Sequence, residues 1–470
     1  MSQSTALIPL RPATTLGQLQ SRPGLPFAEY LPAALIRRTA QRVHYCFRER
    51  IYTPAVTLWT FLSQVIDADH SCRQAVARLL AYRTAHQLPP CSPDTGGYCK
   101  ARERLPEELL QELTRGTGAE LDAKAAPTWR WKGRSVKIID GSGVSLPDTA
   151  RNCAAYPKHT TNGHQVGFPV MRLVVLFSLS VGSVLDAAFG AFSGKGQGEL
   201  SLGRRLQEQL VAGDVLVADA LYSNFWTVAY ALARGADVVL RLPAKRAPWF
   251  SRGRRTDRCI DWQNPGRPEW MSKAEYAGMP KVLRVRTVSV PVRQPGFRTR
   301  RLVLVTTLTD ADAVSKADLA ELYRRRWQAE LYLRSLKQTL QMDILRSQTP
   351  EMARKEVWAH LLVYNIVRSV MAQAAAQAEI RPDEVSFTGA LQTINAFLPD
   401  MRSVKTAEDA QVLWEIILWA VGTHRVGNRP NRYEPRSVKR HEKGYNRLTI
   451  PREEARKRLR KRVKECSKTR

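Results

Sequence analysis

A continuous apolar run, DVLVAD at 214–219, constrains the fold of this 470-residue chain more than any other feature. A strand that is apolar on both faces has to be covered on both faces, which is typical of an α/β sheet between helices. Neighbouring strand-like runs are 134–140, 170–180, 183–190 and 236–242, and helical patterns occupy 198–210 and 222–234. We therefore predict an α/β fold in which helices flank a mixed sheet.

Composition and pattern divide the rest of the chain into further segments. The boundaries that we expect are a flexible arm at 1–28, an all-helical DNA-binding domain at 29–130, a sheet domain at 131–242 and 314–378, a β-rich insertion at 243–313, and a helical, basic C-terminal region at 379–470. The final fifty residues, 421–470, hold 18 Lys and Arg against 5 Asp and Glu. Such a basic segment favours contact with a polyanion.

The net charge indicates the class of partner. The chain has 73 Lys and Arg against 43 Asp and Glu, a formal charge of +30. Self-repulsion of this size favours binding to nucleic acid, with an anionic membrane as the second option. The most apolar stretch, 173–192, is interrupted by Gly182 and Asp186, so we expect no membrane span. The N-terminal residues do not resemble a secretion signal, and the seven cysteines are scattered, which favours a cytoplasmic protein with reduced thiols.

A second constraint is a set of four polar residues at helical spacing: Tyr323, Arg326, Glu330 and Lys337. On one continuous helix they fall within an arc of about 60°, at about 100° per residue. Ser315 and Asp318 have the spacing of a capping box that begins this helix. The stripe suits the binding of a polyanion beside a metal. A solvated face with an ion pair between Arg326 and Glu330 is the alternative.

Three carboxylates are candidates for a metal site. Asp140 ends a predicted strand before a Gly-Ser-Gly turn, Asp219 ends the apolar run, and Glu330 lies on the predicted helix. Residues that follow strand ends lie at the edge of the sheet where ligands bind. Three converging carboxylates require cations, and Mg²⁺ or Mn²⁺ prefers such oxygen ligands. Two ions can then support phosphoryl transfer. Alternatively, the two Asp residues are ordinary turn residues.

Together these residues resemble the DDE transposases of bacterial insertion sequences, in the group marked by Tyr-x₂-Arg-x₃-Glu-x₆-Lys. Every interval of that signature is met by Tyr323, Arg326, Glu330 and Lys337. The resemblance continues through most of the chain, in the segments IIDGSGVSLPDT (138–149), GFPVMRLVVLFSL (167–179), GKGQGEL (194–200), GDVLVADALY (213–222) and TPEMARKEVWAHLLVYNIVR (349–368).

The resemblance implies an RNase H-like catalytic domain interrupted by a β-rich insertion before the glutamate helix. It implies that Asp140, Asp219 and Glu330 are catalytic and hold Mg²⁺ or Mn²⁺, with two ions. Tyr323, Arg326 and Lys337 would then bind the DNA end. By the same resemblance the protein would bind terminal inverted repeats of double-stranded DNA as a homodimer and cut the element ends. It would form hairpin ends and join the 3′ ends to target DNA, without a nucleotide cofactor. A metal-dependent nuclease and a non-catalytic DNA-binding relative are the alternatives.

Several residues depart from the family or invite over-interpretation. Ala220 stands where close relatives often have Arg, and the segment RLVLVTTL lacks the Trp that stacks on a flipped base in some relatives. Trp327 is a weak candidate to replace that Trp, because we expect it to pack in the core. The glycine-rich GKGQGEL lacks the spacing of a phosphate loop. We do not expect Asp148 or Asp186 to bind metal.

Overall fold

The structure is a computed structural model that describes residues 31–47, 50–161, 164–243, 245–246, 256–291, 301–403, 406–427, 450 and 452–468. The predicted flexible arm at 1–28 lies outside the described residues. No helix among the described residues is long and apolar enough to cross a membrane.

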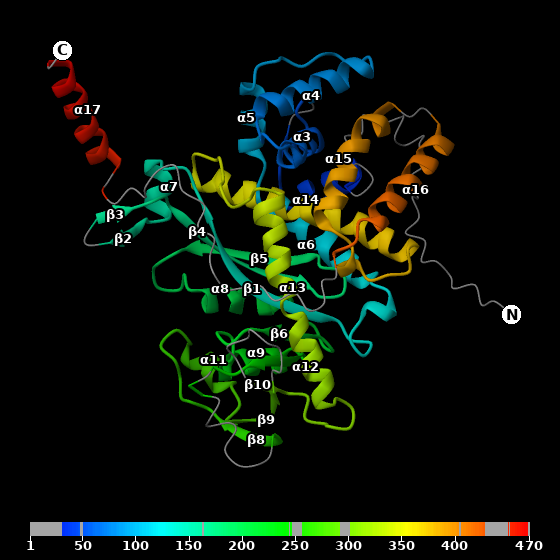
Figure 1. Ribbon diagram of the computed structural model, residues 1–470, viewed down its shortest axis with the longest axis vertical. Coiled ribbons are helices and arrows are strands. Elements are labelled where there is room, and N and C mark those ends of the chain that lie inside the picture. Colours follow the sequence, from blue (N-terminus) through cyan, green and yellow to red (C-terminus); the bar gives the residue numbers. More distant parts are fainter. Residues whose placement is uncertain are drawn as a thin grey trace.

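One mixed sheet forms the centre of the molecule (Figure 1). Its strand order among the described residues is β5-β4-β1-β6-β7-β10-β9-β8. The strands are β1 (Val136–Ser145), β4 (Val170–Ser178), β5 (Val184–Ala191), β6 (Val215–Ala218), β7 (Asp237–Arg241), β8 (Asp257–Gln263), β9 (Val282–Pro291) and β10 (Arg301–Thr306). β1, β6 and β7 are parallel, whereas β4 and β5 continue the sheet as antiparallel neighbours of β1. The arrangement of β5, β4, β1, β6 and β7 is RNase H-like.

The predicted β-rich segment 243–313 contributes strands to the same sheet. β10 pairs antiparallel with β7, β9 with β10, and β8 with β9. The short helix α11 (Lys273–Ala277) lies between β8 and β9 in sequence. The described part of this segment therefore extends the sheet beyond β7, in the lower half of Figure 1.

Alternating side chains of the central strands enter two separate cores. Ile138 of β1 and Val217 of β6 belong to one apolar cluster, and their neighbours Ile139 and Ala218 belong to the other. Helices α8 (Glu199–Leu206) and α9 (Phe225–Ala233) cover the second face. The apolar run at 214–219 is buried on both faces, as its sequence predicts.

The other face is covered by helices from distant parts of the chain. The long helix α14 (Pro350–Gln377) packs there beside the N-terminal helices, which are α2 (Ala33–Arg42), α3 (Pro54–Ile66), α4 (Cys72–Ala85), α5 (Gly96–Arg104) and α6 (Glu107–Ala123). Asn365 of α14 donates to the carbonyl oxygens of Thr114 in α6 and Val184 in β5. Arg115 forms a bidentate ion pair with Asp186, at 2.8 Å for both contacts. Most of these helices thus share one core with the sheet.

The predicted single helix of the signature is interrupted, which corrects the sequence analysis. α12 (Lys316–Arg325) ends in a tight turn at Arg326 and Trp327, α13 (Gln328–Arg334) follows, and Ser335–Thr339 form a π-helical turn. The N–H groups of Trp327 and Glu330 bond to carbonyls three residues earlier, so the chain is overwound at the turn. The predicted capping box of Ser315 and Asp318 is confirmed.

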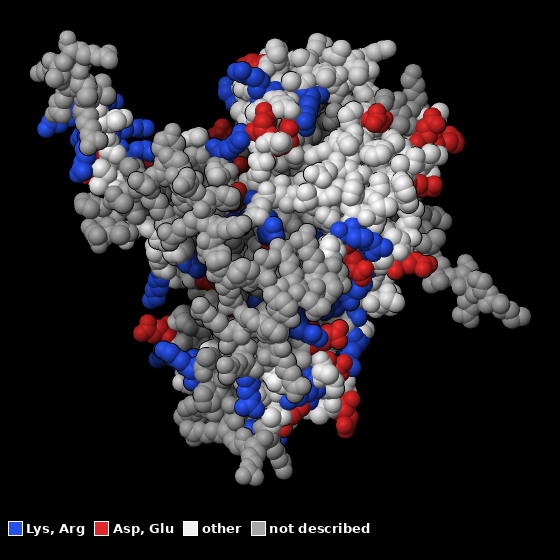
Figure 2. All heavy atoms as spheres, in the orientation of Figure 1, with Lys and Arg blue, Asp and Glu red and all other residues white. Residues whose placement is uncertain are grey.

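Further helices lie at the periphery. α7 (Ala150–Ala155) precedes a small hairpin of β2 (His159–Thr161) and β3 (His164–Val166). α15 (Phe387–Ser403) and α16 (Ala407–Thr423) pack on α14, and α17 (Arg452–Lys468) is a strongly basic helix. In Figure 2 basic side chains lie over several elements, α17 among them, while an area with few charges covers α15 and α16.

Candidate active site

The sheet brings Asp140 and Asp219 to the same level. β1 pairs in parallel with β6 through Val136–Val215 to Ile138–Val217, and continuing that register by two residues sets Asp140 opposite Asp219. Asp219 follows the last residue of β6, and its carboxylate accepts a hydrogen bond of 2.8 Å from the N–H of Leu221. Side chains at this end of the parallel strands face the ligand-binding edge of the sheet.

The predicted end of the first strand at Asp140 is wrong. β1 continues to Ser145, because β4 pairs with it antiparallel along the whole stretch from Lys137 to Ser145. Asp140 lies in the middle of a long strand, just beyond the point at which its other neighbour, β6, ends. One side of β1 is therefore open at Asp140, and the carboxylate is accessible from the cavity.

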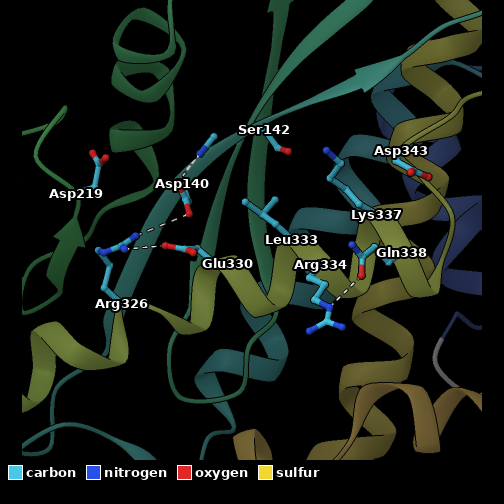
Figure 3. A pocket seen from close by; sticks show the side chains of 11 residues that line it. Asp140, Ser142, Asp219, Arg326, Glu330, Leu333, Arg334, Lys337, Gln338 and Asp343 are labelled. Atoms are coloured by element: carbon cyan, nitrogen blue, oxygen red, sulfur yellow. Dashed lines mark hydrogen bonds and ion pairs between the residues drawn. The ribbon is translucent and has the colours of Figure 1, made fainter. Parts of the chain in front are cut away.

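Arg326 lies between two of the three predicted carboxylates (Figure 3). Its Nη2 donates to Oε1 of Glu330 at 2.9 Å, and its Nη1 is 3.9 Å from Oδ2 of Asp140. The tight turn after α12 places the guanidinium beside Asp140 in the middle of β1, and α13 then carries Glu330 toward the same point. The ion pair between Arg326 and Glu330, which the sequence offered as a sign of a solvated helix face, is thus present. Both residues nevertheless line a cavity.

One cavity of about 530 Å³ contains five of the six predicted site residues. Asp140, Asp219, Arg326, Glu330 and Lys337 line it, together with Gly141, Ser142, Leu333, Arg334, Gln338 and Asp343. Lys337 lies on the π-helical turn, at the opposite end of the cavity from Asp219 (Figure 3). Asp140, Asp219, Arg326 and Glu330 therefore lie toward one end of the cavity, and Lys337 and Asp343 lie toward the other (Figure 3).

Tyr323 is the predicted site residue that does not line this cavity. Its side chain is buried, with the Arg326 guanidinium carbon 5.9 Å from the ring centroid. Burial raises the pKa of the Tyr323 hydroxyl to about 12. The structure therefore places Tyr323 where it supports Arg326, and not where it lines the cavity.

The surroundings of Asp140 disfavour its ionised form. The pKa of Asp140 is raised to about 6, mainly by burial and to a smaller extent by the charges of Asp219 and Glu330. The N–H of Gly141, which donates to Asp140 at 2.9 Å, and the Arg326 guanidinium oppose this shift. A carboxyl group that is costly to ionise alone is stabilised as an anion by a cation. Strongly shifted groups in a cavity indicate a functional site.

The donor chemistry fits the divalent metal that the family implies. Carboxylate oxygens from Asp140, Asp219 and Glu330 are the ligands that Mg²⁺ and Mn²⁺ prefer. Among the described residues, however, no three acidic, His or Cys side chains lie close enough together to hold one ion. The Arg326 guanidinium between Asp140 and Glu330 supplies the positive charge in this arrangement.

Trp327, Asp148 and Asp186 are not among the residues that line the cavity. Trp327 does not pack in the core, because its position in the tight turn leaves the side chain 57% exposed. Asp186 pairs with Arg115 and Asp148 with Lys158, so both spare carboxylates have structural partners.

One acidic residue beside the site, Glu199, was not among the residues predicted from the sequence. It begins α8 in the segment GKGQGEL and lies against β1 at Gly141. The negative charges of Asp219 and Asp140 act on it. The glycine after Asp140 and the family-like segment GKGQGEL are the local signals. The contact itself joins two segments that are distant in the sequence, so local spacing does not predict it.

Comparison with known proteins defines the class. The family model described as Transposase DDE domain matches residues 131–366, half of the chain. The chain therefore belongs to the DDE transposases, and it is an enzyme of the transposase and nuclease type. Its relatives place it with the transposases of the IS4 group of insertion sequences.

The most extensive similarity among these relatives is to Transposase InsG for insertion sequence element IS4 of Escherichia coli (strain K12). The two are 27% identical over 365 residues, which cover 77% of this chain and 79% of InsG. The transposase for insertion sequence element IS421 of Escherichia coli is 27% identical over 191 residues, 34% of this chain and 52% of that protein. Among solved structures, the piggyBac transposase synaptic complex with hairpin DNA aligns over 88% of both chains, with a TM-score of 0.42 and 11% identity.

Proposed function

We propose that this protein is a cut-and-paste transposase that binds the terminal inverted repeats of its own element, cuts the ends and joins them to target DNA. The observation that supports this most is that the three predicted carboxylates meet Arg326 and Lys337 in one cavity. We would not expect a solubilising charge stripe to lie in a cavity beside Asp140 of β1 and Asp219 after β6. The cavity matches phosphodiester chemistry, in which anionic oxygens and a metal have to be held together.

Each of the six predicted site residues has a distinct part in the proposal. Asp140, Asp219 and Glu330 would hold Mg²⁺ or Mn²⁺, as two ions. When bound, the metal would activate the attacking water or 3′-hydroxyl and stabilise the leaving oxygen. Arg326 would bind a DNA phosphate as a fork, and Lys337 would bind one as a point charge. Tyr323 would hold Arg326 in position through the contact between its ring and the guanidinium.

Contact with a DNA base is also part of the proposal. Trp327 follows Arg326 directly and is 57% exposed. We propose that it stacks on a base near the bound phosphate, an aromatic contact worth about 1–3 kcal/mol. Replacing Trp327 with Ala would then lower the affinity for an element end by roughly tenfold, whereas Trp270→Ala, at a 40% exposed Trp in the segment between β8 and β9, would not.

A second copy of the chain completes the proposed assembly. On α16, Val412, Ile416 and Trp419 lie at helical spacing and are 56%, 44% and 67% exposed. Soluble monomers rarely expose such contiguous apolar surface, so this stripe supports association into the expected homodimer. Light scattering on the complex with an element end would give the mass of two chains plus the bound DNA. A complex with a single chain would contradict this part of the proposal.

The deciding assay separates joining from cutting. The protein is incubated with Mg²⁺ and a donor DNA that carries the inverted repeats flanking its gene. Hairpin or joined products support the proposed transposase, whereas nicks without joining would support the alternative nuclease. Binding without cleavage would favour a non-catalytic DNA-binding protein.

Carboxylate variants test the assignment of the site. Asp219→Ala and Glu330→Ala should abolish cleavage and leave the affinity for an element end within about twofold. Glu321→Ala is the control, because Glu321 is an exposed carboxylate on α12 outside the cavity. Cleavage that survives in Asp219→Ala or Glu330→Ala would contradict the assignment.

A further inference from the structure

Helix α8 brings the Glu199 carboxylate into close approach with β1. A Cβ atom added at Gly141 would lie 2.4 Å from Cδ of Glu199 and 2.6 and 2.7 Å from its two oxygens. Real Cβ atoms do not approach other heavy atoms so closely, so any larger residue at Gly141 would displace Glu199. Gly141, which follows Asp140, therefore leaves free the space that the Glu199 carboxylate occupies against β1.

A buried tyrosine lies behind this carboxylate. Tyr222 is 1% exposed, and its hydroxyl interacts with the Glu199 carboxylate without forming a hydrogen bond of good geometry. Gly203 of α8 makes room for it, because a Cβ there would lie 2.5 Å from Cε1 of Tyr222. Burial raises the pKa of this hydroxyl, and the charges of Glu199, Asp140 and Asp219 raise it further. Two glycines thus accommodate a polar pair at the back of the site.

Glu199 is poorly placed for stability. An acidic residue in the first turn of a helix is ordinarily stabilised by the helix dipole while it faces solvent. Here the side chain is partly buried, which raises the pKa of Glu199, and the negative charges of Asp219 and Asp140 raise it further. Arg172 and Tyr222 oppose the shift. A carboxylate held near two others costs stability unless a cation joins them.

We propose that Glu199 is a positioning residue of the active site, a fourth acidic group that strengthens the hold of Asp140 and Asp219 on a divalent cation. It acts from the α8 side of β1, whereas Glu330 acts from the α13 side. Because Gly141 has no side chain, the Glu199 carboxylate can lie against β1 next to Asp140. This inference rests on the proposed function, because it assigns Glu199 to the metal that the reaction uses.

The first test is the affinity for Mn²⁺ in the absence of DNA, measured by titration followed by electron paramagnetic resonance. Glu199→Gln keeps the shape of the side chain and removes its charge. One negative charge near a divalent ion in a partly buried site corresponds to roughly a tenfold change in affinity, so the variant should bind Mn²⁺ about tenfold more weakly. At saturating Mn²⁺ its cleavage rate should return to within about twofold of the wild type.

Glu208→Gln is the matched control, because Glu208 is exposed shortly after α8. It should bind Mn²⁺ as the wild type does. Unchanged Mn²⁺ affinity in Glu199→Gln would overturn the inference while leaving the proposed function intact. A wild-type protein that binds Mn²⁺ but neither cuts nor joins its element ends would instead overturn the proposed function.

The second test uses the steric relation between Gly141 and Glu199. Gly141→Ala should displace Glu199, so it should lower both the melting temperature and the Mn²⁺ affinity. The double variant Gly141→Ala with Glu199→Ala removes the clash and should recover the melting temperature, but not the metal affinity. Recovery of both, or of neither, would contradict the proposed role of Glu199.

Discussion

Arg326→Gln is the perturbation with the sharpest expected result, because one side chain is assigned two incompatible partners. In the structure the guanidinium lies between Glu330 and Asp140, at 2.9 and 3.9 Å. In the proposed DNA complex it binds a phosphate. Removing its charge should therefore strengthen metal binding by the protein alone and weaken binding of an element end.

The expected magnitude follows from the ion pair with Glu330. Two unit charges about 4 Å apart attract by about 4 kcal/mol at an effective dielectric constant near 20. Glu330 is 38% exposed and Arg326 17% exposed, so water screens part of this attraction. A screened value of about 1–2 kcal/mol is more realistic. A metal that competes with this pair would bind about five- to thirtyfold more tightly once the pair is removed.

The assay is calorimetric titration of Mn²⁺ into the DNA-free protein, followed by the affinity for an element end without metal. Arg334→Gln is the control, since Arg334 lines the same cavity but bonds to Gln338 instead of a carboxylate. It removes the same charge without freeing Glu330. Weaker or unchanged Mn²⁺ binding in Arg326→Gln, or equal gains in both variants, would refute the reasoning.

Three further predictions concern charge in and around the site. Metal-free Asp140→Asn should be more stable than the wild type at pH 7.5 by about 2 kcal/mol, measured by urea denaturation. The raised pKa of Asp140, about 6, means that the folded wild type loses stability as pH rises from about 4 to 6, so the difference should vanish below pH 4. Lys337→Ala should slow cleavage of element ends at least tenfold and change general DNA affinity less than threefold, in gel-shift and cleavage assays. Lys137→Ala should lower the free energy of unfolding by about 3–5 kcal/mol, because it leaves Asp122 buried without its ion-pair partner; a loss below 1 kcal/mol would mean that water replaces the lysine.

The local pattern was sufficient for much of the fold. The apolar run at 214–219 predicted a doubly covered strand because its side chains leave no polar face, and the structure buries it on both sides. The hairpin of β4 and β5 and the capping box at Ser315 follow from equally local chemistry. The spacing of Tyr323, Arg326, Glu330 and Lys337 is also a local property, and together with the segments around Asp140 and Asp219 it indicated the family.

What the sequence alone determined is therefore the identity of the polar residues and the elements that carry them. Only the tertiary structure decided that β1 continues past Asp140, because that depends on pairing with β4, and that Trp327 is exposed, because a tight turn interrupts the helix. It also brought Arg326 between Glu330 and Asp140, and Glu199 against Gly141. Such contacts join residues far apart in the chain, so they are set by how helices pack on the sheet, which local spacing does not encode.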